Sequence, residues 1–185
     1  MSGSGPDGDA YLGLGDAARL AEEIAARGER RSRWSRAGEI ATWGGTLEDL
    51  AERHQFAVVS MAGGRTHRGT LVAVGRDHLA VRSQGHQLAL LHTAAIRSIR
   101  PEPGTTVPLA TGDRDRSDGR TIVEVLGLLA EEQARVVLGL RDVDGLLAGV
   151  LLGLGEDIIT LQIEGGDGGV VFLPLGAVQE LLLER

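Results

Sequence analysis

Apolar and polar residues alternate over much of the chain beyond residue 55, in short runs that end at glycine-containing turns. A period of two is typical of strands that bury one face. The runs follow one another at intervals of about 8–12 residues, a spacing typical of small barrels. The pattern predicts strands over residues 56–61, 69–74, 79–83, 87–91 and 96–99, and again over residues 135–140, 148–153, 158–163, 169–173 and 178–183.

A helix is expected before each set of strands. Thr46–Asp49 and Thr121–Glu124 both have the spacing of a capping box, in which a hydroxyl and a carboxylate satisfy free amides at the start of a helix. Apolar residues recur at helical spacing in both segments. A third helix is expected over Asp16–Arg27, because Asp16 is a suitable N-cap and Gly28 a suitable C-terminal stop.

The two sets of strands are internal repeats. Gly69–Asp77 (GTLVAVGRD) matches Gly149–Asp157 (GVLLGLGED) at an offset of 80 residues, and Phe56–Met61 lines up with Val136–Arg141 at the same offset. Similarity at a fixed period predicts the duplication of a unit of about 55–65 residues. The repeat also favours a strand over a helix for residues 178–183, which fit both patterns.

The expected fold class is therefore α+β, mainly β with short helices. We expect four parts along the chain. They are a helical N-terminal segment with arginine and tryptophan over residues 1–45, a first five-stranded barrel over residues 46–100, a linker over residues 101–119 and a second barrel over residues 120–185.

The pattern Gly-x-Leu-x-x-Val-Gly-x-Asp at residues 69–77, preceded by a helix and set among five bent strands, resembles the Sm-like fold. The chain also resembles a family of proteins of unknown function from high-GC bacteria that carry two such barrels. The resemblance covers about residues 46–100 and 120–185. It implies two tandem Sm-like five-stranded barrels, each preceded by a helix.

The resemblance also implies where RNA would be contacted. RNA-binding members of the Sm-like fold place an aspartate and an asparagine in the loop after the second glycine-containing strand, and a basic pair, Arg-Gly or Lys-His, before the last strand. Asp77 and Asp157 match the aspartate, whereas the chain contains no asparagine. The positions nearest to the basic pair are Leu91-His92 and Leu173-Pro174.

Composition excludes several kinds of chemical site. The chain has no cysteine, which excludes disulfides, thiolate zinc sites and cysteine nucleophiles. Its five histidines lack metal-ligand spacing, and it has neither a Gly-x-Ser-x-Gly motif nor a phosphate-binding loop. Residues 113–124 approach a calcium-loop pattern, but the glycine comes one position late. We expect no enzyme activity, no metal, no cofactor and no small-molecule substrate.

No secretory leader is recognisable at the N-terminus, and no apolar stretch is long enough to span a bilayer. We therefore expect a cytoplasmic protein without a membrane partner. Charge is uneven: residues 51–103 hold 7 arginines against 3 acidic residues, whereas residues 124–185 hold 3 against 11. A basic first barrel and an acidic second barrel bear on the choice of partners.

Two classes of function follow. In the first, the chain is an adaptor or scaffold that assembles through protein contacts, as a homo-oligomer or with a protein partner. Uncharged apolar strand edges support this hypothesis, because such an edge must be covered by the sister barrel or by another molecule. The candidate edge residues are Leu88, Leu90, Leu91, Val170, Val171 and Phe172.

In the second class, the basic first barrel and an arginine-rich segment bind RNA, since arginines contact phosphates and a tryptophan stacks on a base. Alternatively, Trp34 and Trp43 hold the N-terminal segment against the first barrel, with the arginines exposed or paired with nearby glutamates. A DNA-associated regulator is a third alternative. The candidate RNA-binding residues are Arg30, Arg31, Arg33, Trp34, Arg36, Arg65, Arg68, Arg76, Asp77, His78 and His92.

Overall fold

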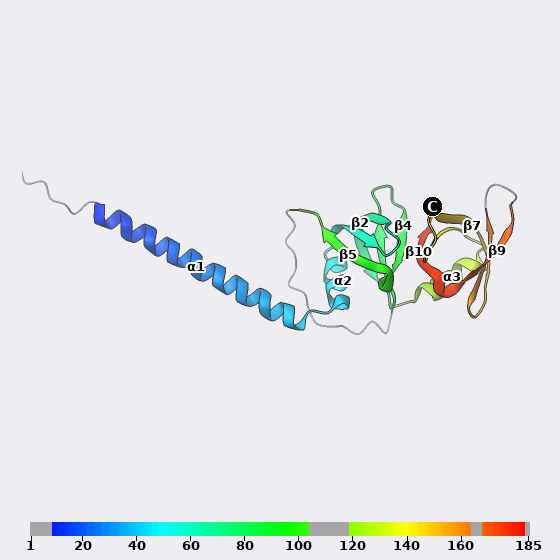
Figure 1. The fold of residues 1–185 in the computed structure, drawn as a ribbon, viewed down its shortest axis with the longest axis horizontal. Coiled ribbons are helices and arrows are strands. Elements are labelled where there is room, and N and C mark those ends of the chain that lie inside the picture. Colours follow the sequence, from blue (N-terminus) through cyan, green and yellow to red (C-terminus); the bar gives the residue numbers. More distant parts are fainter. Residues whose placement is uncertain (1–8, 104–118, 164–167, 184–185) are drawn as a thin grey trace, which may run out of the picture.

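The computed structural model describes residues 9–103, 119–163 and 168–183, except for the side chains of residues 9–17, 33, 34 and 36–40. The protein is mainly β, with three α-helices and ten strands in these residues (Figure 1). Most of the predicted linker and the first half of the calcium-like pattern fall in residues 104–118, outside the described residues.

Two sets of five strands follow one another along the chain, each preceded by a helix. The first part comprises α1 (Asp9–Ile40), α2 (Trp43–Glu52), β1 (Phe56–Met61), β2 (Thr66–Val74), β3 (His78–Arg82), β4 (Leu88–His92), the 3-10 helix η1 (Thr93–Ala95) and β5 (Ile96–Pro101). The second part comprises α3 (Ile122–Glu131), β6 (Arg135–Leu140), β7 (Leu146–Leu154), β8 (Ile158–Ile163), β9 (Val170–Pro174), the 3-10 helix η2 (Leu175–Ala177) and β10 (Val178–Leu183).

We call α2 with β1–β5 the first unit, and α3 with β6–β10 the second unit. All ten strands form one antiparallel sheet in the order β5-β1-β2-β3-β4-β10-β6-β7-β8-β9. Both units therefore have the strand order fifth, first, second, third, fourth. The prediction of a mainly β chain with helices is confirmed. The described strands do not pair into closed barrels, since β5 and β9 each have one neighbour.

The two units share the same irregularity in the pairing of their second and third strands. The pairing of β2 with β3 shifts after Leu71, and that of β7 with β8 shifts after Leu151, again at an offset of 80. A bulge of this kind bends the strand that carries it. Gly69 and Gly149 lie just before the shifts, and a Cβ at either glycine would overlap the carbonyl of the opposite strand. Both glycines therefore permit a close approach of two backbones.

The repeat departs from the predicted offset at its beginning. Phe56 pairs with Thr70, and its counterpart Arg135 pairs with Val150, so the first strands match at an offset of 79. The alignment of Phe56–Met61 with Val136–Arg141 is therefore wrong by one residue. Four residues separate β1 from β2 whereas five separate β6 from β7, and this longer turn restores the offset of 80.

The same shift explains an error in the predicted helix start. The N-cap of α2 is Thr42, whose hydroxyl accepts a hydrogen bond from the Gly45 N–H at 3.0 Å, and not Thr46. Thr46 lies within the first turn and donates its hydroxyl to the Thr42 carbonyl. The prediction for Thr121 is confirmed, since its capping box with Glu124 is complete.

Helix α1 is longer than predicted. It begins before Asp16 and continues through Gly28, so Asp16 is not its N-cap and Gly28 does not terminate it. Gly28 does not have the positive φ that terminates a helix at glycine. Figure 1 shows α1 projecting away from the sheet, and Trp43 is 45% exposed. In the described part of the chain, no helix has both the length and the apolarity needed to cross a membrane.

One hydrophobic core lies under α2 and a second lies under α3. Leu47 and Leu50 of α2 pack into the first core, and Leu126 of α3 packs into the second. Each core also takes in residues of the other unit: Leu182 of β10 belongs to the first, and Leu90 of β4 to the second. The two units are therefore packed together as well as connected.

Candidate interaction site at the junction of the units

The two units are joined by the pairing of β4 with β10. The register places Leu88 opposite Leu183 and Leu91 opposite Glu180. The apolar edge predicted at Leu88, Leu90 and Leu91 is thus covered by the sister unit, and Leu90 is 5% exposed and Leu91 0%. The fourth strand of one unit and the fifth strand of the other therefore form the interface.

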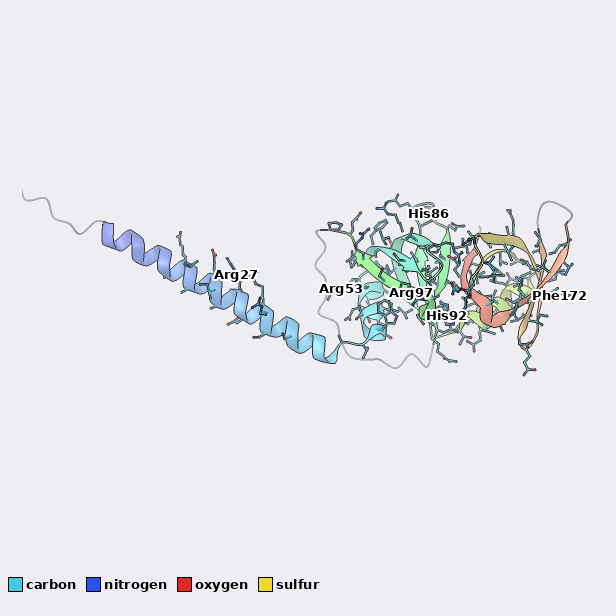
Figure 2. The ribbon with its side chains drawn as sticks, in the orientation of Figure 1. Arg27, Arg53, His86, His92, Arg97 and Phe172 are labelled. Atoms are coloured by element: carbon cyan, nitrogen blue, oxygen red, sulfur yellow. The ribbon has the colours of Figure 1, made fainter. Side chains whose placement is uncertain are left out.

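The second predicted edge is open. Among the described strands β9 pairs with β8 alone, and Val170 is 48% exposed. Phe172 is 67% exposed, and Figure 2 shows it at the end of the molecule away from α1. At the opposite end of the sheet, β5 pairs with β1 alone and presents the exposed side chains of Arg97 and Arg100. The sheet therefore ends in one apolar edge and one basic edge.

A buried carboxylate lies beside the β4–β10 pairing. Glu180 is 0% exposed and sits in the mostly apolar strand VQELLL. Arg65, in the turn between β1 and β2, donates from Nε to Oε1 of Glu180, and Nε2 of His67 on β2 contacts Oε2. We call these three residues the Glu180 cluster. The first unit supplies both partners of a charge that the second unit buries.

Arg65 also reaches the backbone of the second unit. Its Nη1 donates to the carbonyls of Val143 and Gly145, both at 3.3 Å, and its Nη2 donates to the Leu140 carbonyl at 3.4 Å. Gly139 pairs with Glu180, and a Cβ at Gly139 would overlap the Glu180 carboxylate. The absence of a side chain at Gly139 therefore makes room for the cluster.

The surroundings of Glu180 act on its pKa in opposite directions. Burial is the largest influence and raises the pKa, whereas the hydrogen bond from His67 and the charges of His67 and Arg65 lower it. The net result is a pKa below the ordinary value of 4.5. Glu180 is therefore ionised at neutral pH, and both carboxylate oxygens can accept from Arg65 and His67.

The Glu180 cluster was not predicted from the sequence. A single glutamate inside a buried strand was the available signal, because a buried charge needs a partner. The partner could not be read from the repeat, since the counterpart of Glu180 in β5 is Ser98. For Arg65, the sequence predicts only a possible contact with RNA.

The turn between β2 and β3 forms a second attachment between the units. Oδ1 of Asp77 accepts a hydrogen bond from the N–H of Ile122, the first residue of α3, at 2.8 Å. The N–H of Arg76 donates to the Arg120 carbonyl at 3.1 Å. Asp77 therefore holds the start of α3 against the first unit, beside the capping box of that helix.

The predicted RNA-binding residues lie in different settings. Asp77 and Arg65 contact the second unit, and His78 is 7% exposed with its Nδ1 3.2 Å from Oδ1 of Asp77. Nδ1 of His92 accepts a hydrogen bond from the Ala94 N–H at 3.2 Å, at the start of η1.

The remaining candidates are exposed or undescribed. Arg68 lies on β2 and Arg76 in the following turn, both exposed, and Arg30 and Arg31 are exposed on α1. The last three candidates have side chains outside the described residues: Arg33, Trp34 and Arg36.

A cleft of about 980 Å³ opens where the units meet. Turns and short helices of both units line it, and Figure 2 shows His92 and Arg97 near this junction. Its apolar lining includes alanines of the first unit and Leu175 of the second. The charged and polar side chains of its described lining are those of Asp77, His92, Arg97, Arg141, Asp142, Asp144, Glu156, Asp157 and Gln179.

In comparisons with known protein families, curated proteins and solved structures, the chain gives no significant match. Within the described residues, no group of three or more histidine, aspartate or glutamate side chains is placed to hold a metal ion. The described site offers backbone hydrogen-bonding groups at two open sheet edges, and carboxylates around a cleft.

Proposed function

We propose that the chain is a non-enzymatic assembly protein built from two Sm-like units, which joins further copies of itself edge to edge. Three features support the Sm-like assignment: a helix before each unit, the repeated strand order, and the glycine-aspartate pattern of residues 69–77. The assembly hypothesis depends on one observation, the β4–β10 pairing inside the chain.

That pairing joins a fourth strand to a fifth strand. The remaining fourth strand, β9, and the remaining fifth strand, β5, are the two open edges at opposite ends of the sheet. The same pairing can therefore be repeated between copies, with β9 of one copy against β5 of the next. Such a head-to-tail contact produces a ring if the rotation closes and a filament if it does not.

The backbone groups of β9 suit this arrangement. The Ile163 N–H donates to the Gly169 carbonyl at 3.0 Å, which marks a bonded pair at the end of the β8–β9 ladder. Residues in an antiparallel ladder alternate between bonded and non-bonded pairs. Val170 and Phe172 therefore occupy non-bonded positions, and their N–H and C=O groups point away from β8 toward the open edge.

The groups of β5 complement them. The Glu102 N–H donates to the Phe56 carbonyl at 3.1 Å, which marks a bonded pair in the β1–β5 ladder. By the same alternation, Ile99 and Pro101 occupy non-bonded positions and direct their backbone groups to the open edge. The register of the internal pairing, transferred at an offset of 82, places Ile99 opposite Phe172 and Pro101 opposite Val170. The first pair exchanges two hydrogen bonds, and the second makes one because proline lacks an N–H.

Charge supports the same orientation. The β5 edge carries arginines, whereas β9 ends beside the turn that holds Glu156 and Asp157. Opposite charges on two surfaces steer their encounter. The position of Glu180 is taken by Ser98 in β5, so the contact between copies has no counterpart of the Glu180 cluster. We therefore expect reversible association, weaker than the internal pairing.

Light scattering after size-exclusion chromatography tests the proposal. The wild-type mass is expected to rise from 19.5 kDa in whole-chain steps as concentration increases. Phe172→Pro removes an N–H that points away from β8 and is bonded to no described residue, and proline is tolerated at such edge positions. We expect Phe172→Pro to remain monomeric with an unchanged circular dichroism spectrum.

Phe172→Ala is the matched control, because it removes the ring and keeps the N–H. It should associate more weakly than wild type and more strongly than Phe172→Pro. A single 19.5 kDa species at high micromolar wild-type protein, or equal masses for wild type and Phe172→Pro, would refute edge pairing.

RNA binding is the second candidate function. Val58 of β1 lies between Arg68 of β2 and Arg100 of β5, so the three side chains share one face, and both arginines are exposed. Filter binding with pooled cellular RNA should then weaken steeply with salt, because neutralised phosphates release counterions. Absence of binding at low salt excludes this function. Replacing Arg30, Arg31, Arg33 and Arg36 with serine tests whether that segment contributes to the slope.

A further inference from the structure

The junction inside the chain buries one face of β3 and β4. Ala80 and Leu90 pair with each other, are each 5% exposed and belong to the hydrophobic core that includes Leu126 of α3. Their counterparts at offsets of 80 and 82 are Thr160 on β8 and Phe172 on β9, which also pair with each other. Phe172 is 67% exposed. The face that the first unit buries at the junction is therefore open in the second unit.

The start of α3 is covered by the same junction. Ile122, its first residue, is 3% exposed and belongs to that core, and its N–H donates to Oδ1 of Asp77 at 2.8 Å. The N-caps Thr42 and Thr121 relate α2 to α3 at an offset of 79, so Trp43 is the counterpart of Ile122. Trp43 is 45% exposed, and its N–H donates to no described residue. The chain thus covers the start of α3 and leaves the equivalent start of α2 open.

The turn between β7 and β8 is built like the turn that holds α3. Asp157 lies 80 residues after Asp77, and both aspartate carbonyls accept from a backbone N–H at 2.8 Å, that of Leu175 and that of Thr93 respectively. The Asp157 carboxylate is exposed and has no hydrogen bond with a described residue. It therefore occupies the position from which Asp77 binds a helix start.

We propose that the start of α2 of a second copy docks on this open face, with Trp43 against Phe172 and the Trp43 N–H bonded to Asp157. The inference rests on the proposed pairing of β9 with β5, because that pairing brings α2 of one copy beside β9 of another, as the internal pairing brings α3 beside β4. The contact between copies thereby repeats both the strand pairing and the helix attachment of the internal junction.

The side chains at these positions suit a contact between separate chains. The internal junction has Leu90 and Ile122, whereas the open positions have Phe172 and Trp43, in a chain with two phenylalanines and two tryptophans. Aromatic residues are enriched in the buried parts of protein interfaces. A carboxylate beside the first amides of a helix is also stabilised by the helix dipole.

Tryptophan fluorescence tests the docking with the full-length chain. Trp34→Phe leaves Trp43 as the only tryptophan. Its emission should shift to shorter wavelength over the protein concentrations at which the mass in light scattering rises, because the ring leaves water. Phe172→Pro in the same background should keep the emission of the dilute protein at every concentration.

Asp157→Ala tests the hydrogen bond to the helix start. It should weaken association about fivefold, since a helix-start amide loses its acceptor. Asp157→Asn keeps a side-chain oxygen and should weaken association less than alanine does. Glu156→Ala is the matched control, because it removes the same charge from the same turn. Its counterpart Arg76 bonds the segment before α3 through a backbone N–H that alanine keeps, so we expect a change of less than about twofold.

Edge pairing and helix docking fail in distinguishable ways. A wild-type chain that stays at 19.5 kDa refutes both. Association with unchanged Trp43 emission, or equal weakening by Asp157→Ala and Glu156→Ala, refutes the docking and leaves edge pairing in place. Association that shifts the Trp43 emission and is weakened selectively by Asp157→Ala supports both.

Discussion

Replacement of Arg65 by alanine should destabilise the whole protein. The variant leaves Glu180 fully buried with His67 as its remaining partner, and it removes the hydrogen bonds to the three carbonyls of the second unit. Breaking a buried ion pair costs about 3–5 kcal/mol because one charge stays buried without compensation. We expect the lower end, about 3 kcal/mol, since His67 still contacts the carboxylate.

Urea unfolding followed by circular dichroism measures this loss. For a chain of this size, each kcal/mol corresponds to about 2–4 °C in the melting temperature, so about 3 kcal/mol lowers it by about 10 °C. Arg68→Ala is the matched control, because Arg68 is an exposed arginine on the neighbouring strand. It should change the free energy of unfolding by less than about 0.5 kcal/mol.

Removal of all three charges together tests whether the loss in Arg65→Ala comes from burying Glu180 without its arginine partner. The variant Arg65→Leu/His67→Leu/Glu180→Leu leaves no charge at this site, and well-packed apolar replacements of this kind are often neutral or stabilising. We expect its free energy of unfolding to lie within about 1 kcal/mol of the wild-type value. Equal stability of Arg65→Ala and Arg68→Ala, or a triple variant that is the least stable of the set, would refute this role of the Glu180 cluster.

Three further predictions concern the junction. Gly139→Ala should lower stability by about 1–3 kcal/mol because its Cβ overlaps the Glu180 carboxylate, whereas Gly153→Ala, with open space at its Cβ, should be nearly neutral in the same urea assay. The lowered pKa of Glu180 stabilises the folded protein fully above the unfolded pKa of 4.5, and this stabilisation is lost as pH falls through the folded pKa. The free energy of unfolding should therefore fall below pH 4.5, and the triple leucine variant should lack this part of the loss. Asp77→Ala should cost about 1 kcal/mol and speed hydrogen exchange at the start of α3, because the Ile122 N–H loses its acceptor.

The strands could be predicted from sequence because alternation and glycine turns are local properties. All ten predicted strands occur; five begin at the predicted residue and the other five begin within three residues of it. The predicted start of β2 came too late because Thr66 and Arg68 show no apolar alternation, although both pair with β1. The predicted end of α1 at Gly28 was wrong because a glycine ends a helix only where the backbone adopts a positive φ.

The junction could not be predicted because it depends on tertiary contacts. Arg65 and Glu180 lie 115 residues apart, and no repeat relates them. The edge at Leu88–Leu91 and the edge at Val170–Phe172 look alike in sequence, and only the topology shows that the first is covered. The Asp77 carboxylate fitted an RNA-contact pattern, whereas in the structure it accepts from a helix amide. A side chain in a turn takes its role from the element that the fold places beside it.

In the assembly that we propose, the Glu180 cluster determines which edges can meet. A fourth strand that pairs with β10 brings its own second strand beside Glu180, and the first unit then supplies Arg65 and His67. If β9 of another copy took the place of β4 beside β10, Gly145 and Leu147 would stand at the positions of Arg65 and His67, at an offset of 80. Glu180 would then be buried without a partner. β5 has Ser98 at that position and buries no carboxylate there, so we expect β9 of one copy to pair with β5 of the next. We therefore expect the triple leucine variant to lose this selection and to form a broader range of masses in light scattering than wild type at equal concentration. An unchanged distribution would show that the buried charge does not select the edges.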